Sequence, residues 1–140
     1  MLSKEDKYHE LSYYTLSHSS PDFIHQHIVD AFAAQQANEE TKPIKLAFAL
    51  IGLYLHLEKG YSGKQVQQAH MQLGKEHKSW PEFSLPDYRG DIAVDDVLAA
   101  EPGEQRDAMI HAWCQAVWKA YAGSHVKVRV LAQKELLSFD

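Results

Sequence analysis

The chain has 140 residues, of which 45% are hydrophobic and 24% are charged, which is ordinary for a globular protein. This length suits one domain with its own core, and we expect residues 1–140 to form it. The formal net charge is −5 and the lysines and arginines are scattered, which argues against binding to nucleic acid or to anionic membranes.

The cellular compartment is indicated by three features of the sequence. The single cysteine, Cys114, rules out an internal disulfide, as is typical of a protein from a reducing compartment. The first ten residues, MLSKEDKYHE, lack the apolar stretch of a secretion signal. The longest apolar run, residues 46–55, is shorter than the ~20 residues that a membrane helix needs. We therefore expect a cytoplasmic protein that does not span a membrane.

Helical periodicity begins near the start of the chain. Leu11, Tyr14 and His18 form one stripe at i, i+3 and i+7, which predicts a first helix over residues 4–18. Ser20–Asp22 then supplies an N-cap, a proline and an acid, which predicts a second helix over 21–37. Pro43 opens a third helix over 43–59, and its apolar residues cover nearly every face, as in a helix enclosed by others. Seven of its side chains are therefore expected to be buried: Leu46, Phe48, Leu50, Ile51, Leu53, Tyr54 and Leu55.

A capping box marks the start of the fourth helix. Gly60 ends the third helix, and Ser62 and Gln65 have the spacing of a reciprocal N-terminal cap. The fourth helix is predicted over 62–76, as an antiparallel neighbour of the third because the turn is short. Residues 80–91 are predicted to form a loop whose aromatic side chains pack on the bundle.

The last third of the chain is also predicted to be helical. A short helix is expected over 94–100 and a longer one over 104–122. In 126–130 valines alternate with polar residues, as in a strand, whereas 131–137 favours a helix. Because a lone strand would have no partner, we interpret 125–137 as a helix. The predicted fold class is all-α, an up-down helical bundle with additional C-terminal helices.

Histidines are the most informative polar residues. Nine occur in 140 residues, and several take helix positions where an apolar residue is expected. If the first four helices alternate in direction, the first and third turns lie at the same end of the bundle, near one histidine from each helix. Neutral imidazole is a common ligand of zinc and other divalent metals, and bundles build metal sites from facing helices. One hypothesis is therefore a divalent metal, of the zinc or nickel/iron class, held by His18, His25, His56 and His70.

The alternative is that each histidine is a core polar group, bonded to a carbonyl or a tyrosine. The chain has no His-x-x-x-His, Glu-x-x-His or Cys-x-x-Cys motif that would favour a metal. With a metal, hydrolysis or group transfer by activated water or thiol is the most concrete activity. Without one, the protein is a non-catalytic interaction or structural module, and a homodimer is one form it could take. The sequence leaves both hypotheses open and identifies no small-molecule ligand.

Several segments resemble a known family. They include YHELSYYTL at 8–16, FIHQ at 23–26, FALIGLYLH at 48–56 and the later stretch 113–118. These segments resemble an uncharacterised family of small bacterial helical proteins, a domain of unknown function, over nearly the whole chain. This resemblance implies a helical fold and no assigned activity. A looser resemblance, in bundle topology and inward histidines alone, is to the DinB-like bundles, which hold a metal with three histidines and include thiol-dependent transferases and hydrolases.

Overall fold

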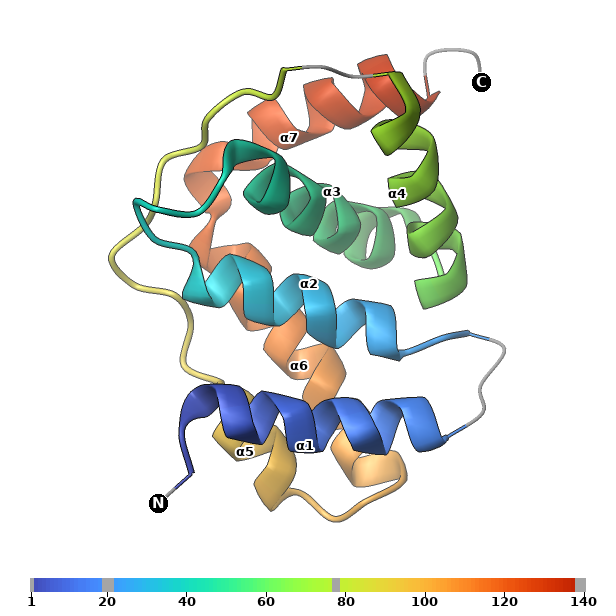
Figure 1. Ribbon diagram of the computed structural model, residues 1–140, viewed down its shortest axis with the longest axis vertical. Coiled ribbons are helices and arrows are strands. Elements are labelled where there is room, and N and C mark those ends of the chain that lie inside the picture. Colours follow the sequence, from blue (N-terminus) through green and yellow to red (C-terminus); the bar gives the residue numbers. More distant parts are fainter. Residues whose placement is uncertain (1, 19–21, 77–78, 138–140) are drawn as a thin grey trace.

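The computed structural model describes residues 2–18, 22–76 and 79–137 (Figure 1). A 3-10 turn (Ala122–Ser124) and a π-helical turn (Gln133–Leu137) flank the last helix. No strand occurs within the described ranges, which confirms the all-α class. The helices are α1 (Lys4–Ser17), α2 (His25–Gln36), α3 (Pro43–Lys59), α4 (Gly63–Glu76), α5 (Val94–Ala99), α6 (Glu104–Ala120) and α7 (His125–Ala132).

The start of α2 differs most from the prediction. The helix was expected from residue 21 but begins at His25. Phe23 has a positive φ of 53°, which an α-helix does not accommodate, and Ile24 at the N-cap makes no side-chain capping bond. Residues 19–21, which include part of the predicted cap, lie outside the described residues.

The ambiguous C-terminal segment is helical, as predicted. Helix α7 buries Val128 and Ala132, while Val126 and Val130 are exposed. The alternation of valines therefore reflects one buried and two solvent-facing positions on a helix, and no strand forms in the described part of this segment.

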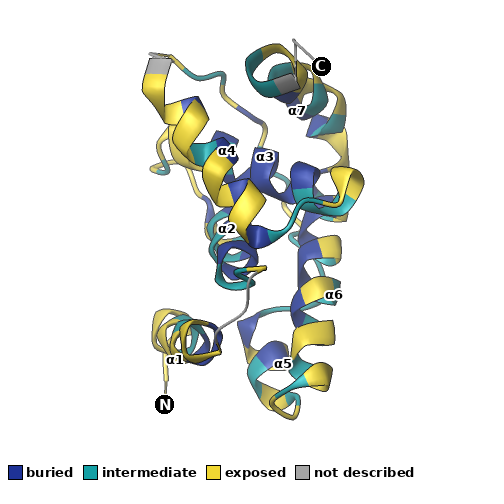
Figure 2. Ribbon diagram, turned by 90° about the vertical axis from the view of Figure 1, so that its right-hand side faces the viewer, coloured by how far each residue is buried: buried dark blue, intermediate teal, exposed yellow. Residues whose placement is uncertain are grey.

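Helix α3 lies at the centre of the core. It packs against α2, α4, α6 and α7, and buried residues cover α3 and the sides of α2 and α6 that face it (Figure 2). Six of its seven predicted core side chains are buried, and Phe48 is half-buried. Burial on all sides is what an apolar helix without a polar face requires. None of the described helices combines the length and hydropathy that a membrane crossing requires.

The turn before α2 and the turn before α4 meet. In Figure 1, α1, α2 and α3 run side by side in alternating directions, and α4 is steeply inclined to α2 and α3, which it contacts. The Lys64 backbone N–H donates to the Asp22 carbonyl at 3.0 Å. Gly63 lies so close to the Phe23 carbonyl that a Cβ at this position would overlap with it. Residues 22–23, before α2, and residues 63–64, at the start of α4, therefore lie in direct contact.

The 79–93 segment is fastened to the end of α2, although it has no regular structure. The Arg89 guanidinium donates to the carbonyls of Ala34, Gln35 and Ala37 at 3.2, 3.0 and 2.9 Å. These bonds satisfy carbonyls at a helix C-terminus that otherwise lack partners. As predicted, Phe83 packs in the core with Trp80 and Leu85 against it, but Tyr88, which was expected to pack as well, is exposed.

Candidate functional site

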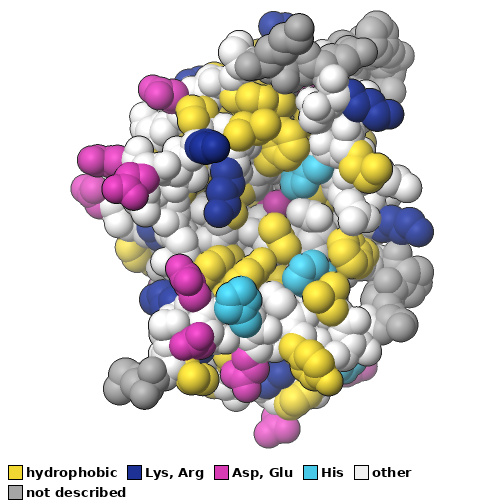
Figure 3. Space-filling model, in the orientation of Figure 1, with side chains coloured by type: hydrophobic (Ala, Val, Ile, Leu, Met, Phe, Trp, Pro, Cys, Tyr) yellow, Lys and Arg dark blue, Asp and Glu magenta, His cyan; other side chains and the backbone are white. Residues whose placement is uncertain are grey.

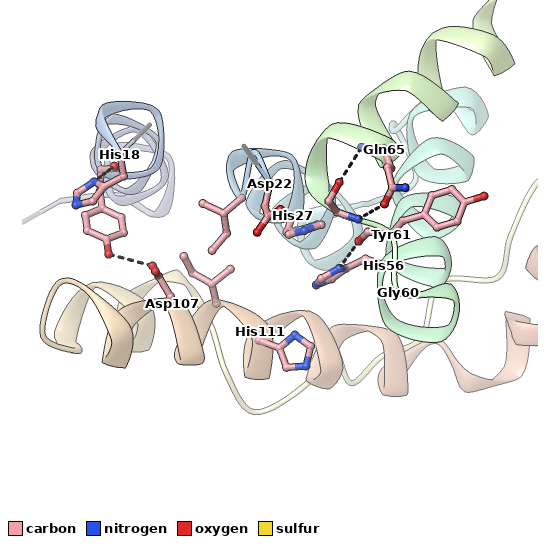
Figure 4. A pocket seen from close by; sticks show the side chains of 13 residues that line it. His18, Asp22, His27, His56, Gly60, Tyr61, Gln65, Asp107 and His111 are labelled. Atoms are coloured by element: carbon pink, nitrogen blue, oxygen red, sulfur yellow. Dashed lines mark hydrogen bonds between the residues drawn. The ribbon is translucent and has the colours of Figure 1, made fainter. Parts of the chain in front are cut away.

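A cavity of about 610 Å³ opens between α1, α2, α6 and the turn that joins α3 to α4 (Figure 4). Its volume lies within the range of small-molecule sites. Apolar walls come from Ile24 and Ile110, and aromatic ones from Tyr14 and Tyr61. Four histidines also line it: His18, His27, His56 and His111.

Two of these histidines form a stack at the inner end of the cavity. The rings of His27 on α2 and His56 on α3 lie with their centroids 3.5 Å apart and an interplanar angle of 18°. The His111 ring, from α6, stands edge-on to His56 at 5.5 Å. Burial, together with smaller effects of the nearby His56 and His111, lowers the pKa of His27 to about 3. Burial also lowers the pKa of His56, so both stacked rings are neutral at neutral pH.

The hydrogen bonds determine which ring nitrogens are open to a ligand. His56 Nδ1 lies 2.9 Å from the Tyr61 carbonyl, and a carbonyl can only accept, so Nδ1 carries the proton and Nε2 keeps a lone pair. His27 is only 6% exposed, yet neither of its ring nitrogens has a hydrogen-bond partner among the described residues. The neutral His27 ring therefore presents one unpaired donor and one unpaired acceptor.

Carboxylates supply the charge of the cavity. Asp22 and Asp107 both line it, and no lysine or arginine is among the described residues that do so. Asp107 Oδ1 accepts from the Tyr14 hydroxyl at 3.0 Å, and that hydroxyl accepts from the Gly103 N–H at 2.8 Å. The bond from Tyr14 of α1 orients the Asp107 carboxylate, which is exposed on α6. The lining therefore carries carboxylates without a lysine or arginine beside them.

Of the four histidines predicted to bind a metal, two line the cavity and two do not. His18 and His56 belong to its walls, whereas His25 and His70 are outside its lining. His18 Nδ1 donates to the Tyr14 carbonyl at 2.6 Å. On the face in Figure 3, histidine side chains lie among hydrophobic ones and do not form one cluster.

His25 and His70 have separate partners. His25 Nδ1 lies 2.9 Å from Thr15 Oγ1, and that hydroxyl donates to a backbone carbonyl, so the histidine is the donor. His70 Nε2 donates to the Phe48 carbonyl at 2.8 Å. No three histidine, cysteine, aspartate or glutamate side chains in the described ranges form a group that could hold a metal ion. The structure thus does not assemble the four predicted ligands, and metal binding stays a prediction.

His27 and His111 line the cavity but were not among the predicted site residues. His27 continues the buried Ala31 and Ala34 stripe of α2, and this spacing is the one signal that could have indicated an inward ring. His111 is exposed on α6 and has no comparable pattern around it.

A comparison with family models identifies the family to which the chain belongs. A family model matches residues 5–122, which is most of the chain. The chain belongs to DUF5946, a family of unknown function. This confirms the resemblance to an uncharacterised family, while the DinB-like resemblance stays a prediction. No curated protein and no solved structure gives a significant match. The matched range of DUF5946 contains every residue of the cavity.

Beneath the histidine stack, this DUF5946 chain buries a carboxyl group. Asp30 is 2% exposed, and its Oδ1 accepts from Gln26 Nε2 at 3.2 Å. The same Gln26 nitrogen lies 3.4 Å from His70 Nδ1, and His70 Nε2 lies 4.0 Å from Asp30 Oδ1. Asp30 Oδ2 has no hydrogen-bond partner among the described residues. Burial raises the pKa of Asp30 well above its ordinary value, which favours a protonated carboxyl.

Proposed function

We propose that this DUF5946 protein binds a small molecule in the cavity, with His27 and His56 as its main polar contacts. The observation that carries the proposal is the His27 ring, which is 6% exposed, lines the cavity and has neither nitrogen bonded to a described residue. Polar groups of native proteins are normally bonded to protein, water or ligand. A ligand in the cavity can therefore bond to the His27 ring without displacing a hydrogen bond to a described residue.

His56 supports the proposal because its free nitrogen is an acceptor. With Nδ1 bonded to the Tyr61 carbonyl, Nε2 keeps its lone pair at neutral pH. A neutral imidazole in this state accepts a hydrogen bond, or a proton, from a bound hydroxyl or ammonium group. Proton transfer to His56 is the simplest chemistry that the cavity offers.

Divalent metal binding is the second candidate. His18, His25 and His56 each donate Nδ1–H to an oxygen, and each Nε2 is left with the lone pair that metal ions use. His18 and His56 also line the same cavity. A metal there would activate water for hydrolysis or group transfer. If neither a metal nor a small molecule binds, the alternative is a non-catalytic interaction or structural module, with homodimer formation as one such role.

Two measurements on protein made without a histidine tag test these proposals. Metal analysis by mass spectrometry determines whether a divalent ion copurifies in stoichiometric amount. Fragment screening by NMR then follows the ring signals of the histidines. We expect fragments that shift His27 and His56 and leave His125, which is outside the cavity lining, unchanged. A diverse fragment set that shifts neither stacked histidine contradicts the small-molecule proposal.

A further inference from the structure

We infer that the ligand of this cavity is a small organic amine with a positive charge and an apolar body, an inference that rests on the proposed small-molecule function. The inference is based on the polar side chains that line the cavity. In Figure 4, Asp22, Asp107, His27 and His56 all lie around the same open volume. Asp107 and His56 present acceptors, and the His27 ring presents one acceptor and one donor.

The Asp107 carboxylate is available to a cationic group. It forms no ion pair with any described residue, and the Tyr14 hydroxyl occupies only part of its accepting capacity. Arg106 lies 4.7 Å from the Tyr14 ring centroid but is not part of the cavity lining. Its guanidinium donates to the carbonyls of Leu98 and Ala100 at 2.8 and 3.2 Å. An incoming ammonium group therefore meets a carboxylate that is oriented but not neutralised by direct pairing.

An anionic ligand meets no lysine or arginine among the described residues that line the cavity. The start of α4 adjoins the cavity, and a helix N-terminus often binds anions through free backbone N–H groups. Here the Lys64 N–H donates to the Asp22 carbonyl, the Gln65 N–H to Ser62 Oγ, and the Val66 N–H to the Ser62 carbonyl. These groups are already bonded, and two carboxylates line the same space. A carboxylate or phosphate ligand would therefore meet charge repulsion, with neutral donors alone to offset it.

The remaining walls accommodate an apolar body. Ile24 and Ile110 provide aliphatic surface, and the stacked rings of His27 and His56 provide aromatic surface. A cavity of about 610 Å³ holds a ring and a short chain with space to spare. The combined requirement is a ring or alkyl chain with an ammonium group at one end.

Three probes with the same ring and different head groups test this inference: 2-phenylethylamine, 2-phenylethanol and phenylacetate. Binding to the full chain is measured at neutral pH by NMR shifts of the His27 and His56 rings. We expect the amine to bind at least about tenfold more tightly than the alcohol, as one charge-assisted hydrogen bond would provide. Phenylacetate should bind most weakly of the three.

A matched pair of variants locates the charge that the amine recognises. Asp107→Asn keeps an acceptor for Tyr14 and removes the charge, so it should weaken amine binding about tenfold and leave alcohol binding unchanged. Asp91→Asn, at an exposed position outside the cavity, should change neither. An equal loss for amine and alcohol in Asp107→Asn would overturn the inference.

The outcomes separate this inference from the proposed function. If the alcohol or phenylacetate binds as tightly as the amine, the amine assignment is wrong while small-molecule binding stands. If Zn²⁺ shifts the histidine rings and the amine does not, the cavity is a metal site and the inference is overturned. If none of the probes and none of the screened fragments binds, both the inference and the proposed function fail.

Discussion

The carboxyl group of Asp30 lies directly against Gly52, where α2 and α3 approach so closely that a Cβ on residue 52 would overlap with Asp30. A glycine inside a helix costs about 1 kcal/mol relative to alanine, so this position carries a local penalty. His27 and His56 lie about one turn from this contact along the same two helices. The close approach at Asp30 and Gly52 therefore brings α2 and α3 near enough for the two imidazole rings to stack.

The first prediction tests this contact by adding a methyl group. Gly52→Ala should destabilise the protein by about 1–3 kcal/mol because the new Cβ overlaps with the Asp30 carboxyl. Combining it with Asp30→Ala should recover part of the loss, which a double-mutant cycle in urea measures. Gly74→Ala is the control, because no atom lies within 4 Å of its Cβ position, and it should stabilise by about 0.5–1 kcal/mol. If the effects of the Asp30 and Gly52 substitutions on stability are additive, overlap with the Asp30 carboxyl is not what destabilises Gly52→Ala.

The second prediction concerns the pH dependence that Asp30 contributes. Because its folded-state pKa is raised well above the ordinary 3.8, the native protein keeps this proton where the unfolded chain has released it. The stability from Asp30 is complete below pH 3.8 and declines as the pH rises through the folded-state pKa. Asp30→Asn, which keeps an acceptor for Gln26, should remove this decline. Urea unfolding of both proteins at about pH 5 and about pH 8 measures it, and an identical change in the two would contradict the assignment.

The third prediction compares two histidines with different bonding. His27→Phe preserves the ring stack and breaks no hydrogen bond to a described residue, so we expect no loss of stability or a small gain. His125→Phe keeps the stack on Trp118 but removes the bond from Nε2 to the Trp118 carbonyl, which should cost about 1 kcal/mol. Thermal and urea unfolding of the two variants give the comparison. A larger loss in His27→Phe than in His125→Phe would mean that His27 is already satisfied in the free protein.

The fourth prediction concerns acid. The pKa of His27 falls from 6.5 to about 3 on folding. Below pH 6.5 the imidazole is therefore protonated in the unfolded chain but stays neutral in the native protein until the pH approaches 3. The stability associated with His27 is complete above pH 6.5 and is lost as the pH falls toward 3. His27→Phe should therefore lose stability less steeply than the natural chain between these pH values. NMR provides a direct check, since the His27 ring signals should not titrate near pH 6.5.

The fifth prediction tests the core around α3. Ile51 is 0% exposed and Leu53 is 1% exposed, so truncating either one to alanine should destabilise the protein by about 2–5 kcal/mol. Ile44→Ala is the control on the same helix, because Ile44 is 41% exposed, and its effect should stay within about 0.5 kcal/mol. A loss below about 1 kcal/mol at both buried sites would mean that α3 is less enclosed than the structure indicates.

The helices could be predicted from the sequence because the signals that define them are local. Apolar periodicity, the capping box of Ser62 and Gln65, and the left-handed Gly60 act over a few neighbouring residues. The start of α2 could not be predicted in the same way. Its position depends on the positive φ of Phe23, whose carbonyl meets Gly63 from a distant part of the chain.

Which histidines meet was decided by the tertiary structure. His25 and His27 are two residues apart on one helix and point in nearly opposite directions, so the rotation of α2 about its axis selects the one that faces α3. That rotation is set by the burial of Asp30, Ala31 and Ala34 against neighbouring helices, with Asp30 against Gly52. His70 bonds to the Phe48 carbonyl instead of joining the cavity because α4 crosses α3 at a steep angle. Local sequence determines that a helix forms, whereas its rotation and crossing angle come from long-range packing, and these determine which side chains share a site.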